Sequence, residues 1–278
     1  MVLESLLEDA FGYLDRAASA SHSAVQFLSS SYELISTNLR LMRTEGKTLS
    51  SVIRELDHDF LTDLPGRRKA LQGFKDKYVR VMDDLSKHEK GTAYIACLYI
   101  DADKLKTAND TYGHDFGDRL IKAIAEVIRH NTRRGDDIVY VTDENYTPIF
   151  SRQGGDEFVA IGRIAKKGDG KIWAERILNT IRSANIALPV GKEFYTPSVS
   201  IGVCEVELTK SDADFYKAML KSAEQGRRGN GDVFMDRDGR KRIDAWLLQQ
   251  YKALCSRADE ALYIAKERGR GRVEICTQ

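Results

Sequence analysis

The sequence predicts an α/β (α+β) fold, in which a sheet carries helices on its faces and follows an N-terminal helical coiled-coil segment. Three observations support this prediction. The chain has 278 residues, of which 42% are hydrophobic and 31% charged, as in a globular protein of one or two domains. Residues 1–57 carry a heptad pattern of apolar residues. From residue 58 onward, helical patterns alternate with short apolar runs.

The N-terminal segment is expected to be helical. Apolar residues recur at alternating steps of four and three from Leu7 to Leu56, and they occupy thirteen of the fifteen positions in this series. So narrow a stripe is typical of a coiled coil or long-helix bundle that pairs with a second chain. A helix lying on its own domain is the alternative. Gly46 interrupts the series and predicts a break or hinge there.

The rest of the chain, residues 58–278, is expected to form one sheet domain. Helical periodicity marks residues 67–85, 118–130, 170–187 and 258–268. Apolar, β-rich runs predict strands at residues 93–101, 138–141, 158–162, 198–206 and 273–276. Strands that alternate with helices are typical of domains in which helices cover the faces of a sheet.

The charge balance argues against some functions. Lys plus Arg number 43 and Asp plus Glu 42, so the net charge of +1 does not suit a protein that coats nucleic acid or an anionic membrane. The longest apolar run, residues 92–100, is too short to span a bilayer, and no signal peptide opens the chain. We therefore expect a cytoplasmic protein with no nucleic-acid partner and no membrane span.

The four cysteines, Cys97, Cys204, Cys255 and Cys276, are far apart in the sequence. They form no CxxC pair, so their spacing indicates neither a zinc site nor a disulfide framework. Cys97 and Cys204 fall within apolar runs and are expected to be buried thiols. This usage fits a reducing, cytoplasmic compartment.

Two acidic groups lie where apolar runs begin or end. Asp101 and Asp103 close the first run, and the glycines at 154–155 are followed by Asp156 and Glu157 at the start of another. If the two strands are neighbours, these four carboxylates converge and offer the hard oxygen ligands that suit Mg²⁺ and, through it, a polyphosphate. Acids that merely cap strand ends in solvent are the alternative.

Two further groups suit a nucleotide. The polar stretch 106–118 contains Asn109 and Asp118, whose amide and carboxylate can read a guanine edge, although a solvated polar loop explains it equally well. Lys266 and Arg270 are four residues apart, on one face if the helix persists, and could bind phosphates. A solvated basic helix end is the alternative.

Taken together, these segments resemble, in their order along the chain, the GGDEF family of diguanylate cyclases. The resemblance covers about residues 57–275 and rests on five segments: 59–68 (Asp-Phe-Leu-Thr-Asp-Leu-Pro-Gly-Arg-Arg), 101–118, 152–158 (Arg-Gln-Gly-Gly-Asp-Glu-Phe), 198–202 (Ser-Val-Ser-Ile-Gly) and 258–266 (Ala-Asp-Glu-Ala-Leu-Tyr-Ile-Ala-Lys). It implies a palm-like domain with a central, mostly antiparallel sheet flanked by helices.

The resemblance also implies catalytic and metal-binding roles. Two Mg²⁺ ions per active site, with Mn²⁺ as a substitute, would be held by the carboxylates of Asp101 and Asp156 and the carbonyl of Ala102. Glu157 would orient the ribose and help to activate its 3′-hydroxyl. Glu157, Asp156 and Lys106 are thus the expected catalytic residues.

The substrate is expected to be GTP. By the same resemblance, Asn109 and Asp118 would hold the guanine edge. The phosphates would be bound by Lys106, Lys266 and Arg270, with backbone N–H groups around Asp103 to Leu105; the family usually has Phe where this chain has Leu105. Two GTP would condense to cyclic di-GMP and two pyrophosphates across a homodimer held by the N-terminal helices.

Two alternatives remain at this point. A catalytically inactive GGDEF module would bind GTP or cyclic di-GMP and signal through protein contacts. A related cyclase would make another cyclic nucleotide, which Asn109 together with Asp118 argues against.

Two insertions depart from the family pattern. An Arg-x-x-Asp pair, Arg134 and Asp137, matches a site at which the family binds its product. Here, however, 16 residues separate it from Gly154, because an expected hairpin at about 138–150 intervenes. The second insertion, about 222–248, is expected to be a mobile basic surface excursion, or else to contact nucleotide or partner.

Part of this second insertion resembles a calcium loop. Phe234 and Ala245 stand at its first and twelfth ligand positions, so we do not expect calcium to bind there.

Overall fold

The computed structural model describes residues 57–88, 91–130, 148–187, 193–227, 233–235 and 237–276. The expected coiled coil of residues 1–57 lies outside this part of the chain, except for Asp57. Arg134, Asp137 and residues 138–147 of the hairpin expected at about 138–150 also lie outside it. The account below concerns the compact unit formed by residues 57–278.

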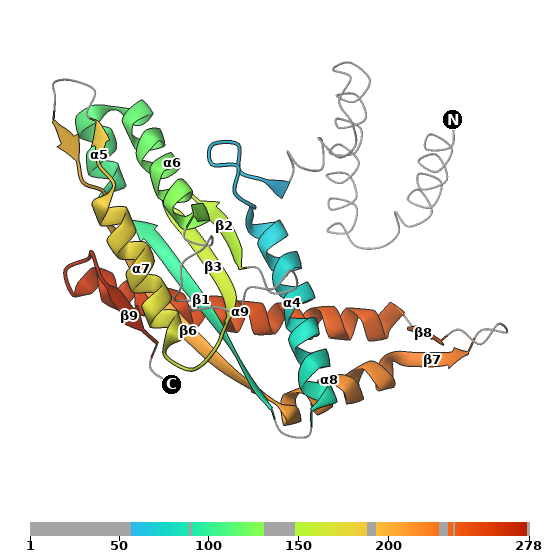
Figure 1. Ribbon diagram of the computed structural model, residues 1–278. Coiled ribbons are helices and arrows are strands. Elements are labelled where there is room, and N and C mark those ends of the chain that lie inside the picture. Colours follow the sequence, from blue (N-terminus) through green and yellow to red (C-terminus); the bar gives the residue numbers. More distant parts are fainter. Residues whose placement is uncertain are drawn as a thin grey trace, which may run out of the picture. The chain divides into compact units, whose positions relative to one another are not determined.

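A five-stranded sheet forms the centre of this unit (Figure 1). Its strands are β1 (Thr92–Ala102), β2 (Ile149–Gly154), β3 (Glu157–Ile164), β6 (Val199–Thr209) and β9 (Val273–Ile275). They lie in the order β2-β3-β1-β6-β9, and every neighbouring pair is antiparallel except β6 and β9. The mostly antiparallel sheet expected from the resemblance is therefore confirmed.

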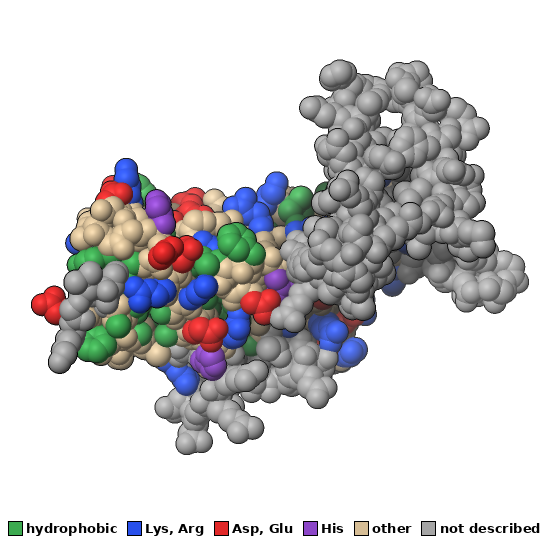
Figure 2. All heavy atoms as spheres, turned by 90° about the horizontal axis from the view of Figure 1, so that it is seen from above, with side chains coloured by type: hydrophobic (Ala, Val, Ile, Leu, Met, Phe, Trp, Pro, Cys, Tyr) green, Lys and Arg blue, Asp and Glu red, His purple; other side chains and the backbone are tan. Residues whose placement is uncertain are grey.

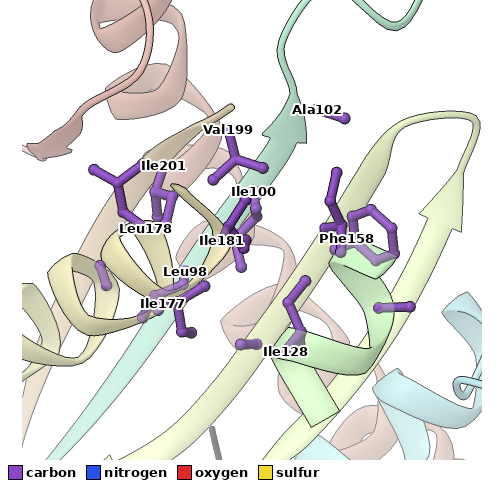
Figure 3. Close-up of a cluster of buried hydrophobic side chains, with 14 of the residues drawn as sticks. Leu98, Ile100, Ala102, Ile128, Phe158, Ile177, Leu178, Ile181, Val199 and Ile201 are labelled. Carbon is purple, nitrogen blue, oxygen red and sulfur yellow. The ribbon is translucent and has the colours of Figure 1, made fainter. Parts of the chain in front are cut away.

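Helices cover both faces of the sheet. Helices α5 (Leu105–Tyr112), α6 (His114–His130) and α7 (Asp169–Ser183) contribute to one apolar core, and α4 (Arg67–Lys87), α8 (Lys210–Ala223) and α9 (Arg237–Glu267) to the other. Alternate side chains of β1 enter opposite cores: Leu98 and Ile100 join the first (Figure 3), while Ile95 and Cys97 join the second. Asp101 therefore lies on the face covered by α9.

The remaining strands form two small sheets. β4 (Ile186–Ala187) pairs with β5 (Phe194–Tyr195), and β7 (Glu224–Arg227) pairs with β8 (Val233–Met235). Residues 186–187 were expected to end a helix, but α7 ends at Ser183 and these residues enter β4 instead.

The polar stretch 106–118 is helical rather than a loop. It forms α5 and the first turns of α6, so the helix expected from residue 118 begins at His114. Gly113 separates the two helices with φ 88°, a positive value that side-chain-bearing residues rarely adopt and that costs glycine no steric strain. Ala108, Phe116 and Leu120 are buried, which gives each helix an apolar anchor.

The insertion 222–248 was expected to be a surface excursion, and for residues 237–248 this expectation is wrong. They form the first part of α9, a helix of 31 residues, whereas the sequence predicted a helix only from residue 258. Ile243, Leu247 and Tyr251 recur every fourth residue and are buried in the core shared with α4 and α8. This spacing was a usable helical signal, but the basic, glycine-containing residues at 226–242 were interpreted as a surface excursion.

Basic and acidic side chains are interspersed over the coloured part of the surface seen in Figure 2. This mixture agrees with the small net charge of the whole sequence. Among the helices that the structure describes, none is both long and apolar enough to cross a membrane.

Candidate active site at the ends of β1 and β3

The acidic end of β1 meets the start of β3. The two strands are antiparallel with Asp101 directly opposite Glu157, and the Ala102 N–H donates to the Asp156 carbonyl over 3.1 Å. Directly opposed residues of an antiparallel pair extend from the same face of the sheet. The strands thus bring Asp101, Asp156 and Glu157 together, as the sequence predicts.

Asp101 is a buried acid with one cation beside it. Its carboxylate oxygen Oδ2 lies 2.8 Å from Lys266 Nζ, on α9, and only 8% of its side chain is exposed. Burial raises the pKa of Asp101 to about 6, and the charge of Asp156 adds to this effect although Lys266 opposes it. A second cation at this position would relieve the repulsion between the two acids.

Tyr99 lies on the same face of β1, two residues before Asp101. Its hydroxyl donates to Glu157 Oε2 over 3.4 Å. Burial raises the pKa of Tyr99, and the charge of Glu157 raises it further, so the phenol remains a donor at neutral pH. Sequence analysis missed Tyr99, although the two-residue spacing from Asp101 on a strand was a usable signal.

The glycine turn that carries Asp156 is fixed by Arg152. Gly154 and Gly155 have φ values of 138° and 52°, so both positions favour glycine. The Nε and Nη2 atoms of Arg152 donate to the Gly155 carbonyl over 3.1 and 2.7 Å. Its Nη1 donates to both carboxylate oxygens of Asp59, over 2.9 and 3.0 Å. These two residues belong to segments that we recognised in the sequence, but their contact was not predicted.

Asp103 lies near Asp101 and, beyond the larger effect of burial, helps to raise its pKa, but the carboxylate of Asp103 is itself occupied by hydrogen bonds. Its buried carboxylate accepts hydrogen bonds from Ser198 Oγ (2.6 Å), Ser200 Oγ (2.7 Å) and the Gly271 N–H (3.0 Å). The chain turns after Ala102, so this acid connects the ends of β1 and β6 with the loop after α9. Asp103 therefore has a structural role.

Arg270 does not share a helical face with Lys266, because α9 ends at Glu267. Arg270 has φ 64°, its N–H donates to the Ala265 carbonyl over 3.0 Å, and its side chain is exposed. The next residue, Gly271, is held by Asp103. The loop thus keeps Arg270 close to the end of α9 by backbone contacts rather than by helical spacing.

Asn109 and Asp118 belong to adjacent helices, α5 and α6. Asn109 Oδ1 is buried and has no hydrogen-bond partner among the described residues. Gly117 makes the close approach of the helices feasible, because a Cβ there would lie 1.8 Å from Asn109 Oδ1. Asp118 is exposed beside it. A buried acceptor without a partner suits a ligand that brings a donor.

Leu105 and Lys106 lie in the first turn of α5, where Lys106 is exposed and Leu105 is partly buried. Lys104 precedes them with φ 60°. The Asp103 N–H was expected to bind a phosphate. It instead donates to the Ser198 carbonyl over 2.9 Å and is therefore not available. Backbone contacts to a phosphate would fall to Lys104 and Leu105, at the N-terminal end of the helix.

The oxygen atoms at this site fit a cation that is bound partly by the protein and partly by the phosphates of a substrate. No group of three or more His, Cys, Asp and Glu side chains in the described part of the chain could hold a metal alone. Asp101 and Asp156 offer two carboxylates, and Ala102 adds a carbonyl. Mg²⁺ is commonly bound by one or two carboxylates together with substrate phosphates.

The antiparallel sheet and the Gly-Gly-Asp-Glu turn opposite a strand-end aspartate define the class of GGDEF domains. A family model described as "Diguanylate cyclase, GGDEF domain" matches residues 56–228. The chain belongs to this family.

Comparison with known proteins agrees with this assignment. The diguanylate cyclase DosC of Escherichia coli (strain K12) is 29% identical over 251 residues, which cover 90% of this chain and 41% of DosC. The diguanylate cyclase TpbB of Pseudomonas aeruginosa (strain UCBPP-PA14) is 32% identical over 176 residues, covering 63% of this chain and 35% of TpbB. The chain thus spans less than half the length of these relatives.

A solved structure shares the fold. The crystal structure of the GGDEF domain of DgcB from Caulobacter crescentus, in complex with c-di-GMP, has a TM-score of 0.53 and 21% sequence identity. The match covers 80% of this chain and 94% of that domain. The α/β architecture expected from the sequence is therefore that of known GGDEF domains.

Proposed function

We propose that this protein is a diguanylate cyclase that condenses two GTP into cyclic di-GMP and two pyrophosphates. The observation that supports this most directly is the pairing of Asp101 with Glu157 across β1 and β3, with Asp156 beside them and Lys266 2.8 Å from Asp101. Acids and a lysine gathered at one strand end suit phosphoryl transfer, in which negative charge develops on the transferred group.

GTP would lie over α5 and the ends of β1 and α9. Asn109 and Asp118 would hold the guanine edge, because guanine offers N–H donors to the unpartnered Asn109 Oδ1 and to the exposed Asp118 carboxylate. Lys106, Lys266, Arg270 and the N–H groups of Lys104 and Leu105 would bind the phosphates.

The site would hold two Mg²⁺ ions, or Mn²⁺ in their place, on Asp101, Asp156 and the Ala102 carbonyl. When bound, such ions lower the pKa of an attacking hydroxyl and neutralise charge on the leaving pyrophosphate. Lys266 would then release Asp101 and turn to the phosphates. Glu157, held by the Tyr99 hydroxyl, would orient the ribose and help to take the proton of its 3′-hydroxyl.

The reaction needs two active sites that face each other. The 3′-oxygen of each GTP attacks the α-phosphorus of the other, and the bond to the departing pyrophosphate breaks in each. One chain presents one GTP, so we propose a homodimer formed through the heptad pattern of residues 1–57. A helical pair would keep two domains at high local concentration.

The experiment is turnover by the purified full chain. With Mg²⁺ and GTP it should yield cyclic di-GMP, identified by mass, and with ATP no cyclic product. Light scattering on the same sample should give the mass of a dimer. A dimer that binds GTP without forming cyclic di-GMP would overturn the proposal and favour an inactive GGDEF module. A different cyclic nucleotide would indicate a related cyclase.

We also propose Arg134 and Asp137 as a product-binding pair. Titration calorimetry with cyclic di-GMP should show weaker binding to Arg134→Ala than to the unchanged protein. Equal affinities would remove this part of the proposal.

A further inference from the structure

All four cysteines of the chain, which are far apart in the sequence, gather on the α9 side of the sheet. Cys97 and Cys204 lie directly opposite each other on β1 and β6, Cys255 lies on α9, and Cys276 follows β9. The predicted burial of Cys97 and Cys204 is confirmed. Cys97 Sγ is 4.0 Å from Cys255 Sγ, although 158 residues separate them in the chain.

We propose that Cys255 and Cys97 form a peroxide-sensitive pair, in which Cys255 is oxidised first and Cys97 then closes an intramolecular disulfide. The inference depends on thiol chemistry alone, so it stands or falls independently of the proposed cyclase activity. Disulfides in cytosolic proteins, where they occur, are mostly transient and redox-sensing.

Access distinguishes the two sulfurs. Cys255 is partly exposed and lines a groove of about 790 Å³ between α4 and α9, whereas Cys97 is completely buried behind it. A small oxidant such as hydrogen peroxide can therefore reach Cys255 and not Cys97. This arrangement of one accessible thiol with a buried neighbour is typical of sensor cysteines that have a resolving partner.

The chemistry of the two thiols also differs. The hydrogen bond donated by the Cys97 thiol lowers the pKa of Cys255, although burial opposes this shift. The same contact, together with burial, raises the pKa of Cys97. Cys255 is thus the more readily ionised of the pair, and the thiolate is the form that attacks an oxidant.

A donor for the oxidised intermediate is also in place. The Tyr251 hydroxyl is buried and lies close enough to Cys255 to help lower the pKa of that thiol, after the larger effect of Cys97. Tyr251 precedes Cys255 by four residues, so both lie on one face of α9, and both line the same groove. Its hydroxyl could donate to the oxygen that oxidation adds at Cys255.

The proposed reaction has two balanced steps. The Cys255 thiolate attacks one oxygen of hydrogen peroxide, the O–O bond breaks, and hydroxide leaves to become water, which gives a sulfenic acid. Cys97 then loses its proton as its sulfur attacks the Cys255 sulfur, and the S–O bond breaks to release a second water. Two thiols are oxidised to one disulfide and one peroxide is reduced to two waters.

Geometry allows the bond with a small adjustment. The two sulfurs must approach from 4.0 Å to the ~2.05 Å of a disulfide, which side-chain rotation and a slight shift of α9 can supply.

Cys204 is less suited to react, because burial raises its pKa to about 12 and the neighbouring Cys276 adds to this shift. Within the described part of the chain, no three of these thiols are placed to hold a metal ion together.

The test treats the reduced full-length protein with hydrogen peroxide and follows free thiols and mass. Two of the four thiols should disappear with a loss of about 2 Da, and digestion without reductant should yield a peptide pair joining Cys97 to Cys255. Reductant should restore all four thiols.

Three variants test the order of events. Cys255→Ser should lose thiols at least about tenfold more slowly, because the accessible thiolate is gone. Cys97→Ser, or Cys97→Ala if the serine variant does not fold, should accumulate a sulfenic acid at Cys255 that dimedone traps. Cys276→Ser is the matched control and should form the same disulfide as the unchanged protein.

Several outcomes would overturn the proposal. They are no thiol loss under peroxide, a disulfide joining Cys204 to Cys276, a disulfide between two chains, or stoichiometric zinc or iron in the purified protein that is lost when the cysteines are replaced.

Discussion

Arg152 and Asp59, 93 residues apart in the chain, form a two-hydrogen-bond ion pair at the base of the Gly-Gly-Asp-Glu turn. Only 12% and 18% of their side chains are exposed. Because the same guanidinium also binds the Gly155 carbonyl, this pair connects the turn before α4 to the turn that carries Asp156. The position of a candidate site residue thus depends on a contact outside the site.

Asp59→Asn should lower the free energy of unfolding by about 2 kcal/mol at pH 7, because Arg152 would lose its partner in a mostly buried place. Burial raises the pKa of Asp59, but hydrogen bonds from Thr62 and Arg152 outweigh it and hold the pKa below the ordinary value of an aspartate. A lowered pKa contributes stability above the ordinary value, and this contribution is lost as pH falls through the folded pKa. Urea unfolding should therefore show the difference between the two proteins shrinking at acid pH. A constant difference from pH 7 down to acid pH would contradict this account.

Asp156→Ala should abolish turnover, by at least about a hundredfold, and leave the fold intact. Asp156 is only partly buried and lies in the turn between two strands. Its replacement should therefore affect ligand binding and leave the core unchanged. Product formation from GTP and thermal unfolding are the two measurements. Glu207→Ala is the matched control, because Glu207 is exposed at the other end of the β1–β6 ladder, opposite Tyr94. Substantial residual activity in Asp156→Ala would count against its proposed role.

Gly117→Ala should raise the KM for GTP about tenfold and change stability little. The added Cβ would displace the end of the Asn109 side chain, which is flexible, rather than backbone. Asn109→Ala should raise KM by a similar factor, and the double variant should be no worse than either single one. Additive effects would show that Gly117 acts independently of Asn109.

Leu247→Ala should lower the free energy of unfolding by about 2–4 kcal/mol, as expected for a buried leucine. Leu247 lies in the part of α9 formed by the insertion and is 4% exposed. Gln249→Ala, an exposed neighbour on the same helix, should change stability by less than about 0.5 kcal/mol. Chemical unfolding measures both, and an equal, small effect at the two positions would mean that this part of α9 does not join the core.

Removal of residues 1–56 should leave a domain that folds, because residues 57–278 are one compact unit with a core on each face of the sheet. On the proposed function, cyclase activity should fall at low protein concentration and recover as concentration rises, since dimerisation would lose the proposed support of residues 1–56. Activity assays over a dilution series, with light scattering, provide the test. Full activity of the shortened chain at low concentration would contradict the proposed role of this segment.

Local patterns in the sequence predicted much of this domain. Apolar, β-rich runs identified β1, β3 and β6, and the acids at the end of β1 and the start of β3 marked the site. The prediction was weaker where local signals conflict with tertiary packing. The polar residues of α5 resemble a loop when taken alone, and they are helical because Ala108 and the start of α6 are buried against the sheet. The first half of α9 was missed because the basic, glycine-containing residues before it were interpreted as a surface insertion, whereas burial of Ile243 and Leu247 stabilises it as helix.

The sequence by itself determined the family, the order of most elements and the acidic residues of the site, because these depend on short-range spacing. Only the tertiary structure decided that Ser198 and Ser200 bind the Asp103 carboxylate, that Arg152 meets Asp59, and that four distant cysteines gather beside α9. The physical reason is that spacing along a chain specifies which face a side chain occupies. Strand order and helix packing specify which distant side chains share that face.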